Sequence, residues 1–93
     1  MNFAQQNFSV KMFKLLSNAN RLRIIDLISK ADGGLIVTKI AEELALEITN
    51  VSNHLVRLRE NGILQAKQSG NEMHYQIKDQ RAVEILNLTK KLS

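Results

Sequence analysis

Hydrophobic residues in the first third of the chain recur at the spacing of an α-helix. In the first predicted helix, over residues 4–16, these are Phe8, Met12, Leu15 and Leu16. In the second they are Leu22, Ile25 and Ile28, widened by Ile24 and Leu27. The polar residues 17–20 break the first helix and offer N-cap side chains to the second. That helix is predicted to end at residues 32–34, Asp-Gly-Gly, where glycine can adopt a left-handed conformation.

The next segment alternates short apolar runs with polar turns. Residues 35–37 are too few for a helix and are predicted to form a lone edge strand. Thr38 is predicted to cap a third helix. The residues of that helix that face inward are Ile40, Ala41 and Leu44. A turn near residues 45–47 leads to a fourth helix over residues 49–59, which stops at an Asn-Gly pair.

After this Asn-Gly pair the period changes from helical to alternating, which is typical of strands. One face is predicted to carry Leu64, Ala66, Met73, Tyr75 and Ile77, and the other Gln65, Lys67, His74, Gln76 and Lys78. Residues 68–72 have the composition of a hairpin turn. Asp79 is a good cap for a last helix over residues 80–92.

The last helix is apolar around much more than half of its circumference, through Ala82, Val83, Ile85, Leu86, Leu88 and Leu92. A helix of that kind needs cover on two sides, and one small core supplies only one. We therefore predict that it packs against a second subunit, with the first helix beside it. The dimer interface is assigned to Phe8, Met12, Leu15, Ile85, Leu88 and Leu92. The alternative is a frayed tail with surplus leucines.

These elements define a mainly α chain with a small β-hairpin, of the α+β class, as a single domain over residues 1–93. The formal charge of +4 permits nucleic-acid binding without demanding it. The absence of cysteine excludes disulfides, thiolate metal sites and thiol-based redox sensing. With no signal peptide and no long apolar run, the chain is predicted to be cytoplasmic and not bound to a membrane.

The fourth helix divides its residues unusually. Its apolar face carries Val51, Leu55 and Leu58, and its other face carries Thr49, Asn50, Asn53 and Arg57. No acidic residue lies between residues 48 and 59, whereas an ordinary solvated face is rich in Glu and Lys. Short hydrogen-bonding side chains without negative charge suit a surface that lies against base edges and phosphates. The helix therefore predicts double-stranded DNA as the partner.

Three runs of sequence stand out in this region: Leu-Ile-Val-Thr-Lys-Ile-Ala-Glu-Glu-Leu at 35–44, Val-Ser-Asn-His-Leu at 51–55 and Leu-Arg-Glu-Asn-Gly-Ile-Leu at 58–64. Together these runs resemble the ArsR-type family of small winged helix-turn-helix repressors. Residues 16–25 and 73–77 are similar to the family's second helix and second wing strand, so the resemblance covers about residues 13–79. It implies a winged helix-turn-helix fold and a homodimer joined through the first and last helices. It also implies repression of transcription at an inverted-repeat operator.

In a helix-turn-helix the second helix enters the major groove with its N-terminal residues toward the bases. The residues predicted to contact DNA are Thr38, Lys39, Thr49, Asn50, Ser52, Asn53, Arg57, Lys67, Gln68 and Asn71. Asn50 and Asn53 can pair bidentately with adenine, and Arg57 can read guanine or clamp a phosphate. Ser52 either contacts a phosphate or bonds to the backbone near the first turn. His54 is interpreted as a packed, hydrogen-bonded side chain rather than a ligand.

The chain departs from the family at its sensing positions. Many members carry cysteines at places that correspond here to Ile36 and Thr38, and neither side chain replaces a thiolate. Others bind zinc through an Asp and several His on the last helix, where this chain has Asp79, Glu84 and no histidine. No metal site and no cofactor are predicted. The inducing signal stays open, with an organic ligand, a partner protein and simple dilution of the repressor as alternatives.

Two other functions compete with DNA binding. A winged helix can serve as a protein-interaction module, although such a module does not need an acid-free helix face with Asn and Arg. An enzyme is disfavoured, because the chain offers no glycine-rich phosphate loop, nucleophile–base pair or metal cluster. Ser52 and His54 are two residues apart on a helix and do not face each other.

Overall fold

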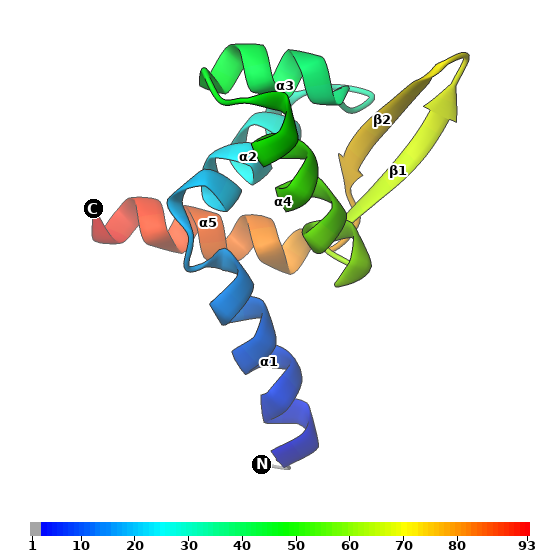
Figure 1. Cartoon of the computed structure of the whole chain (residues 1–93). Helices are drawn as coiled ribbons and strands as arrows, with labels where there is room; N and C mark the ends of the chain where they lie inside the picture. Colours follow the sequence, from blue (N-terminus) through cyan, green and yellow to red (C-terminus); the bar gives the residue numbers. More distant parts are fainter. Residues whose placement is uncertain (1–2) are drawn as a thin grey trace.

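The computed structural model describes the backbone of residues 3–93 and the side chains of residues 10–93. Five helices and one hairpin follow each other in the predicted order (Figure 1). The elements are α1 (Phe3–Leu16), α2 (Ala19–Lys30), α3 (Val37–Leu44), α4 (Ile48–Glu60), β1 (Leu64–Ser69), β2 (Glu72–Ile77) and α5 (Gln80–Leu92). Within this part of the chain no helix has the length and apolar character needed to cross a bilayer.

The second helix begins as predicted and ends earlier than predicted. Asn18 is its N-cap, and the side-chain oxygen of Asn18 accepts a hydrogen bond from the backbone N–H of Arg21 at 3.1 Å. The helix ends at Lys30, and Ala31 is its extended C-cap residue, so the two glycines lie in the following loop. Gly34 has φ +90°, and a Cβ atom there would lie 2.7 Å from the carbonyl oxygen of Tyr75. The second glycine is therefore required by close packing of the loop on the hairpin.

The segment before α3 corrects two predictions. Instead of a strand over residues 35–37, only Leu35 pairs with the hairpin: its N–H donates to Tyr75 O at 3.0 Å, and Tyr75 N–H donates to Leu35 O at 2.8 Å. Val37 is already the first residue of α3, and Ile36 is the N-cap without a side-chain hydrogen bond. The prediction that Thr38 caps this helix is wrong, since Thr38 lies inside the first turn and is exposed.

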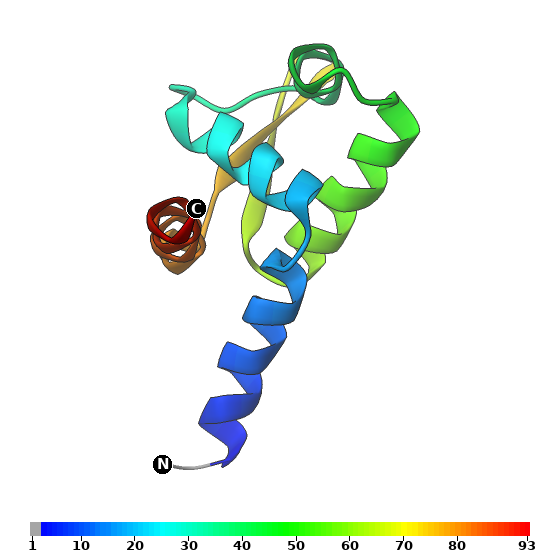
Figure 2. The same ribbon diagram turned by 90° about the vertical axis from the view of Figure 1, so that its left-hand side faces the viewer.

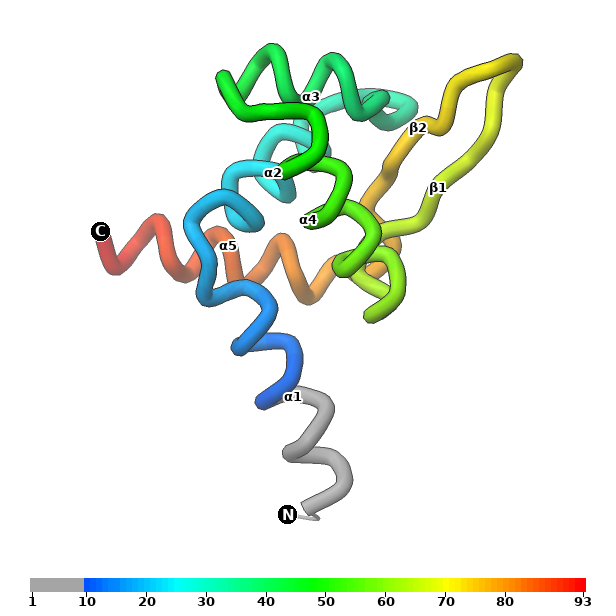
Figure 3. The backbone as a smooth tube through the Cα atoms, in the orientation of Figure 1, coloured from blue at the N-terminus to red at the C-terminus, as the bar shows by residue number. Residues whose placement is uncertain are grey.

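A tight turn joins α3 to α4. Ala45 adopts a left-handed conformation with φ 55°, and Leu46 N–H donates to Ala41 O at 3.0 Å, which ends α3. The chain then turns sharply into α4, as the backbone trace of Figure 3 shows. The inward faces of the two helices contribute to one core with residues of α1, α2, α5 and the start of β1. The fully buried residues of this core include Ile24, Ile25, Ile40, Val51, Leu55, Leu58 and Ile63.

The hairpin has the predicted alternation. Ala66 is opposite Tyr75 and Lys67 is opposite His74, so the apolar and polar positions fall on the predicted faces. Leu64 at its base is buried, whereas Lys67 and Gln68 are exposed. The hairpin reaches past α4 as a projecting wing (Figure 1).

The terminal helices leave apolar side chains uncovered. The side-chain carboxylate of Asp79 caps α5 by accepting the backbone N–H of Arg81 at 3.0 Å, as predicted. In α5 the residues Ala82 and Leu86 are buried, but Leu88 is 50% exposed and Leu92 is 79% exposed. The C-terminal part of α1 packs on the other helices, and the ribbon of the helix runs away from them toward the N-terminus (Figure 2).

The apolar residues assigned to a dimer interface are arranged differently from the prediction. Met12 and Leu15 are packed in the chain's own core, with 6% and 7% of their surface exposed. The side chain of Phe8 lies outside the described residues. Among the described side chains of α1, Val10 and Phe13 are the exposed large apolar ones, at 50% and 54%. They lie one or two positions from Met12, which the prediction had placed in the interface.

Candidate nucleic-acid interface

The outward face of α4 carries short polar side chains. Val51, Leu55 and Leu58 are fully buried on the opposite face. The first two turns present Thr49, Asn50 and Asn53 to solvent, while Ser52 is half-buried at the edge of the face. No acidic residue lies in the first turn, and no side chain caps its N–H groups. These turns can therefore offer hydroxyl, amide and backbone N–H groups to base edges or phosphates.

Arg57 lies toward the C-terminal end of α4, four positions after Asn53 and therefore on the same side of the helix. It lines a hollow of about 390 Å³ together with Lys11, Lys14 and Leu15 of α1. The residue is seven positions after Asn50, which places it about 10 Å further along the helix axis. Arg57 thus follows the amides of Asn50 and Asn53 along the helix and lies beside α1.

His54 is held by a guanidinium group. Arg21 Nε donates to His54 Nδ1 at 3.2 Å, and Arg21 Nη1 donates to the carbonyl oxygen of Leu15 at 3.1 Å. Burial lowers the pKa of His54, and the positive charges of Arg21 and Arg57 lower it further. The interpretation of His54 as a packed and hydrogen-bonded side chain is confirmed.

The two predicted contacts on α3 lie at its exposed N-terminal half. Thr38 and Lys39 are both exposed. Lys39 Nζ is 3.1 Å from Glu43 Oε1, an i,i+4 pair that raises the pKa of Lys39. Because this pair is exposed, it can be exchanged for a phosphate at little cost.

The wing divides its predicted contacts between two faces. Lys67 shares a face with His74 and Gln76, next to Gly33 of the loop after α2. Gln68 lies on the other face, and its side-chain amide donates to Gly70 O at 3.3 Å. Asn71 is exposed at the tip.

The positions related to metal sensing have other roles. Ile36 is the N-cap of α3, and Asp79 caps α5 and pairs with Arg81 Nη2 at 2.7 Å. Within the described part of the chain no three His, Cys, Asp or Glu side chains are grouped as metal ligands would be.

Two features of this surface were not predicted from the sequence. Ile48 and Val56 of α4 are 51% and 46% exposed, although both were outside the predicted apolar stripe and the predicted site. Lys11 and Lys14 lie beside Arg57. Their spacing of three residues places them on one side of α1, but only tertiary structure brings that side to α4.

The chain matches known proteins over most of its length. A family model described as a helix-turn-helix domain matches residues 16–65. An HTH-type transcriptional regulator of Methanocaldococcus jannaschii is 33% identical over 84 residues, which cover 90% of this chain and 93% of that protein. The arsenical resistance operon repressor of Escherichia coli is 34% identical over 68 residues, which cover 73% of this chain and 57% of the repressor.

Solved structures agree with these relatives. The crystal structure of the antimony-specific transcriptional repressor AntR superposes with a TM-score of 0.88 at 36% identity, over 98% of this chain and 81% of AntR. A homodimeric winged helix-turn-helix DNA-binding domain of Mycobacterium bovis, described as a possible ArsR-family regulator, gives a TM-score of 0.80 at 26% identity, over 96% of this chain and 81% of that domain.

The fold and the matches define the class: the chain is a winged helix-turn-helix transcriptional regulator that binds DNA, and its relatives are regulators rather than enzymes. It belongs to the ArsR family. The resemblance found in the sequence and the predicted fold class are confirmed.

Proposed function

We propose that the chain, folded as a single domain, is a homodimeric repressor that binds an inverted-repeat operator through α4 and the wing. The observation that carries the proposal is the acid-free outward face of α4, with Thr49, Asn50 and Asn53 exposed in its first two turns. These turns meet the major groove in a helix-turn-helix. The two amides pair with adenine, and the half-buried Ser52 contacts a phosphate.

The homodimer rests on apolar side chains that a single chain leaves uncovered. Phe13 of α1 and Leu88 and Leu92 of α5 are all at least half exposed, and α1 packs on α5 within one chain. Residues Leu88, Leu92 and the half-buried Ile85 follow a helical spacing that makes one flank of α5. Covering this flank with a second copy removes apolar surface from water. The homodimeric neighbour from Mycobacterium bovis supports the same assembly.

The two-fold symmetry of the dimer then determines the symmetry and spacing of the operator. The recognition helices of the two subunits enter successive major grooves about 34 Å apart, which requires an inverted repeat. Thr38 and Lys39 of α3 approach the phosphates that border the groove. Lys67, Gln68 and Asn71 of the wing contact the neighbouring backbone. The contacts to phosphate make the affinity dependent on salt.

The signal that releases the operator is not a metal bound by thiolates. The arsenical and cadmium resistance regulators and the antimony-specific repressor are relatives by sequence. This chain contains no cysteine, and Ile36 and Thr38 stand at the expected thiolate positions. We infer that it responds to a different class of inducer.

Selection of bound DNA tests this function. The full chain is incubated with fragments of the source genome at low salt, and the retained fragments are sequenced and footprinted with a nuclease. We expect two protected half-sites related by inverted symmetry and separated by one helical turn. Failure to retain any fragment in dilute buffer would contradict the proposal and favour a protein-interaction module.

A further inference from the structure

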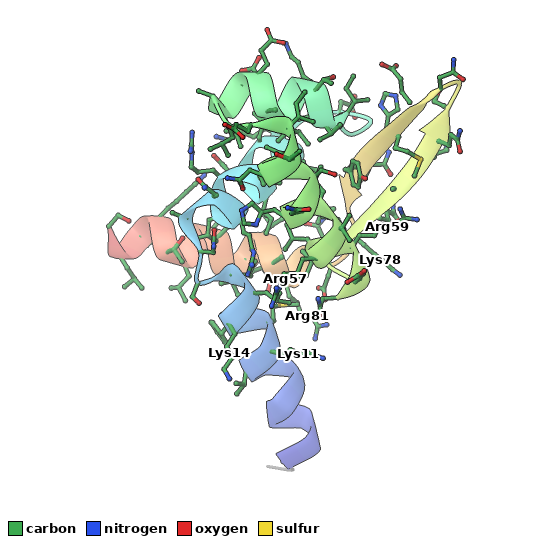
Figure 4. All side chains as sticks on the ribbon, viewed as in Figure 1. Lys11, Lys14, Arg57, Arg59, Lys78 and Arg81 are labelled. Carbon is green, nitrogen blue, oxygen red and sulfur yellow. The ribbon has the colours of Figure 1, made fainter. Side chains whose placement is uncertain are left out.

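A cluster of basic side chains lies at the junction of α1 and α4, away from the N-terminal turns of α4 (Figure 4). Lys11, Lys14 and Arg57 line the same hollow, together with Leu15 and Asn61. Glu60 is the one acidic residue among these lining residues. The hollow therefore carries three cations against one carboxylate.

The cations of this hollow make no ion pair with any described side chain. Among the described side chains, the pairs within 4.0 Å are made by Lys30, Lys39, His74, Arg81 and Lys90. Lys11, Lys14 and Arg57 make none of these pairs, and all three side chains are exposed. Arg57 also lowers the pKa of nearby Arg21, after the effect of burial, and that of His54. The three cations therefore outnumber the single carboxylate of Glu60, and the hollow keeps a net positive charge.

We propose that Lys11, Lys14 and Arg57 form a binding site for the phosphate backbone of DNA, so that α1 is part of the DNA surface. This inference rests on the proposed function and adds a contact that lies outside both the wing and the N-terminal turns of α4. Arg57 acts there as a phosphate clamp and not as a reader of guanine.

The length of α4 supports this placement. Its 13 residues span about 20 Å, whereas the major groove is about 12 Å wide. When the N-terminal turns of α4 meet the bases, its C-terminal end lies beyond the groove and beside the bordering phosphates. The same end carries Arg57, Arg59 and the adjoining Lys11 (Figure 4). The wing and α1 project from the molecule in different directions (Figure 1), so the phosphates that this cluster meets are not those that the wing meets.

An acidic protein segment would also be attracted to this cluster. DNA is favoured because Arg57 lies on α4 itself. When the N-terminal turns of α4 bind in the groove, the phosphates at its border lie next to Arg57. A free phosphate ion has the same chemistry as a backbone phosphate, so the test must distinguish the two.

The test is the dependence of DNA affinity on salt for the variant Lys11→Gln/Lys14→Gln. The full chain is titrated with a mixed-sequence duplex at several salt concentrations. Each lost phosphate contact lowers the slope of log affinity against log salt by about 0.9. We expect the slope to fall by about two for each subunit, with Arg57→Gln lowering it by about one more. The control Lys30→Gln/Lys91→Gln removes the same charge at the ends of α2 and α5 and is expected to keep the wild-type slope.

The outcomes separate this inference from the proposed function. If the wild-type chain binds no DNA, the proposed function fails. If it binds, and the Lys11→Gln/Lys14→Gln slope equals that of the control, the phosphate site is overturned. Titration with inorganic phosphate at constant ionic strength provides the second arm, with chemical shifts of the Lys11 and Lys14 amides as the readout. Saturable shifts in the absence of any change in the DNA slope would assign the hollow to a free anion and overturn the proposal.

Discussion

Arg21 Nε donates a hydrogen bond to His54 Nδ1 at 3.2 Å and thereby connects α2 to the recognition helix α4. The same guanidinium donates to the carbonyl oxygen of Leu15 at the end of α1. One side chain thus joins the helix proposed to dimerise with the helix proposed to read DNA. The bond requires an unprotonated Nδ1, because a protonated nitrogen cannot accept the Arg21 donor.

This bond makes stability depend on pH. Burial and the charges of Arg21 and Arg57 lower the pKa of His54 below its ordinary value of 6.5. The unfolded chain therefore binds the proton at a higher pH than the folded chain, and the free energy of unfolding falls as the pH drops below 6.5. We expect His54→Gln to reduce this loss, measured by urea unfolding at about pH 7.5 and about pH 5.5. The control His74→Gln should lose as much stability between these two pH values as the wild-type chain. If His54→Gln lost as much stability as His74→Gln, the assignment of the pH dependence to His54 would be contradicted.

Of the two glycines after α2, Gly34 is expected to lose more stability when it is replaced by alanine. Both have positive φ, but a Cβ atom meets nothing within 4 Å at Gly33 and meets Tyr75 O at 2.7 Å at Gly34. Gly33→Ala should lower the free energy of unfolding by about 1–2 kcal/mol, because alanine is strained in the left-handed conformation. Gly34→Ala should cost about 1–3 kcal/mol more, because the loop must move away from β2. Chemical denaturation measures the free energy of unfolding of both variants. Equal losses in the two variants would show that the loop does not pack tightly against β2.

Leu88 is expected to hold the dimer together. The residue is half exposed on the apolar flank of α5, so a carboxylate there should be tolerated by the isolated chain but not in a dimer interface. We expect Leu88→Glu to sediment as a monomer at concentrations where the wild-type chain is a dimer. Asn87→Glu introduces the same group on another side of α5 and should remain dimeric. A dimeric Leu88→Glu variant would place the interface elsewhere.

The sequence predicted the elements well wherever a strong local pattern decided them. The i, i+3, i+4 stripe of α4 and the alternation of the hairpin survive unchanged, because one face of each element is covered by the core. Thr38 misled the prediction since its capping propensity is local, whereas the start of α3 is set by the pairing of Leu35 with Tyr75. A single-residue bridge of this kind leaves no pattern in the sequence.

The candidate site was predictable in part, because the pattern within one helix determines which of its residues share a face. Thr49, Asn50 and Asn53 share one exposed face, which helical spacing alone indicates. The residues that surround Arg57 depend on where α1 packs, and this depends on the burial of Met12 and Leu15 in the chain's own core. Contacts between distant segments cannot be read from the spacing within either segment.

The most direct test of the central claim is the affinity of Asn53→Ala for a genome-selected fragment and for a mixed-sequence duplex, both measured at the same salt concentration. Asn53 is exposed at the middle of the acid-free face, and a bidentate amide–adenine contact contributes about 1–3 kcal/mol of discrimination. The account predicts that Asn53→Ala loses about that much affinity for the selected fragment and almost none for the mixed duplex. Asn87→Ala on α5 should change neither. Wild-type discrimination in the Asn53→Ala variant would contradict the claim that this face of α4 reads the operator.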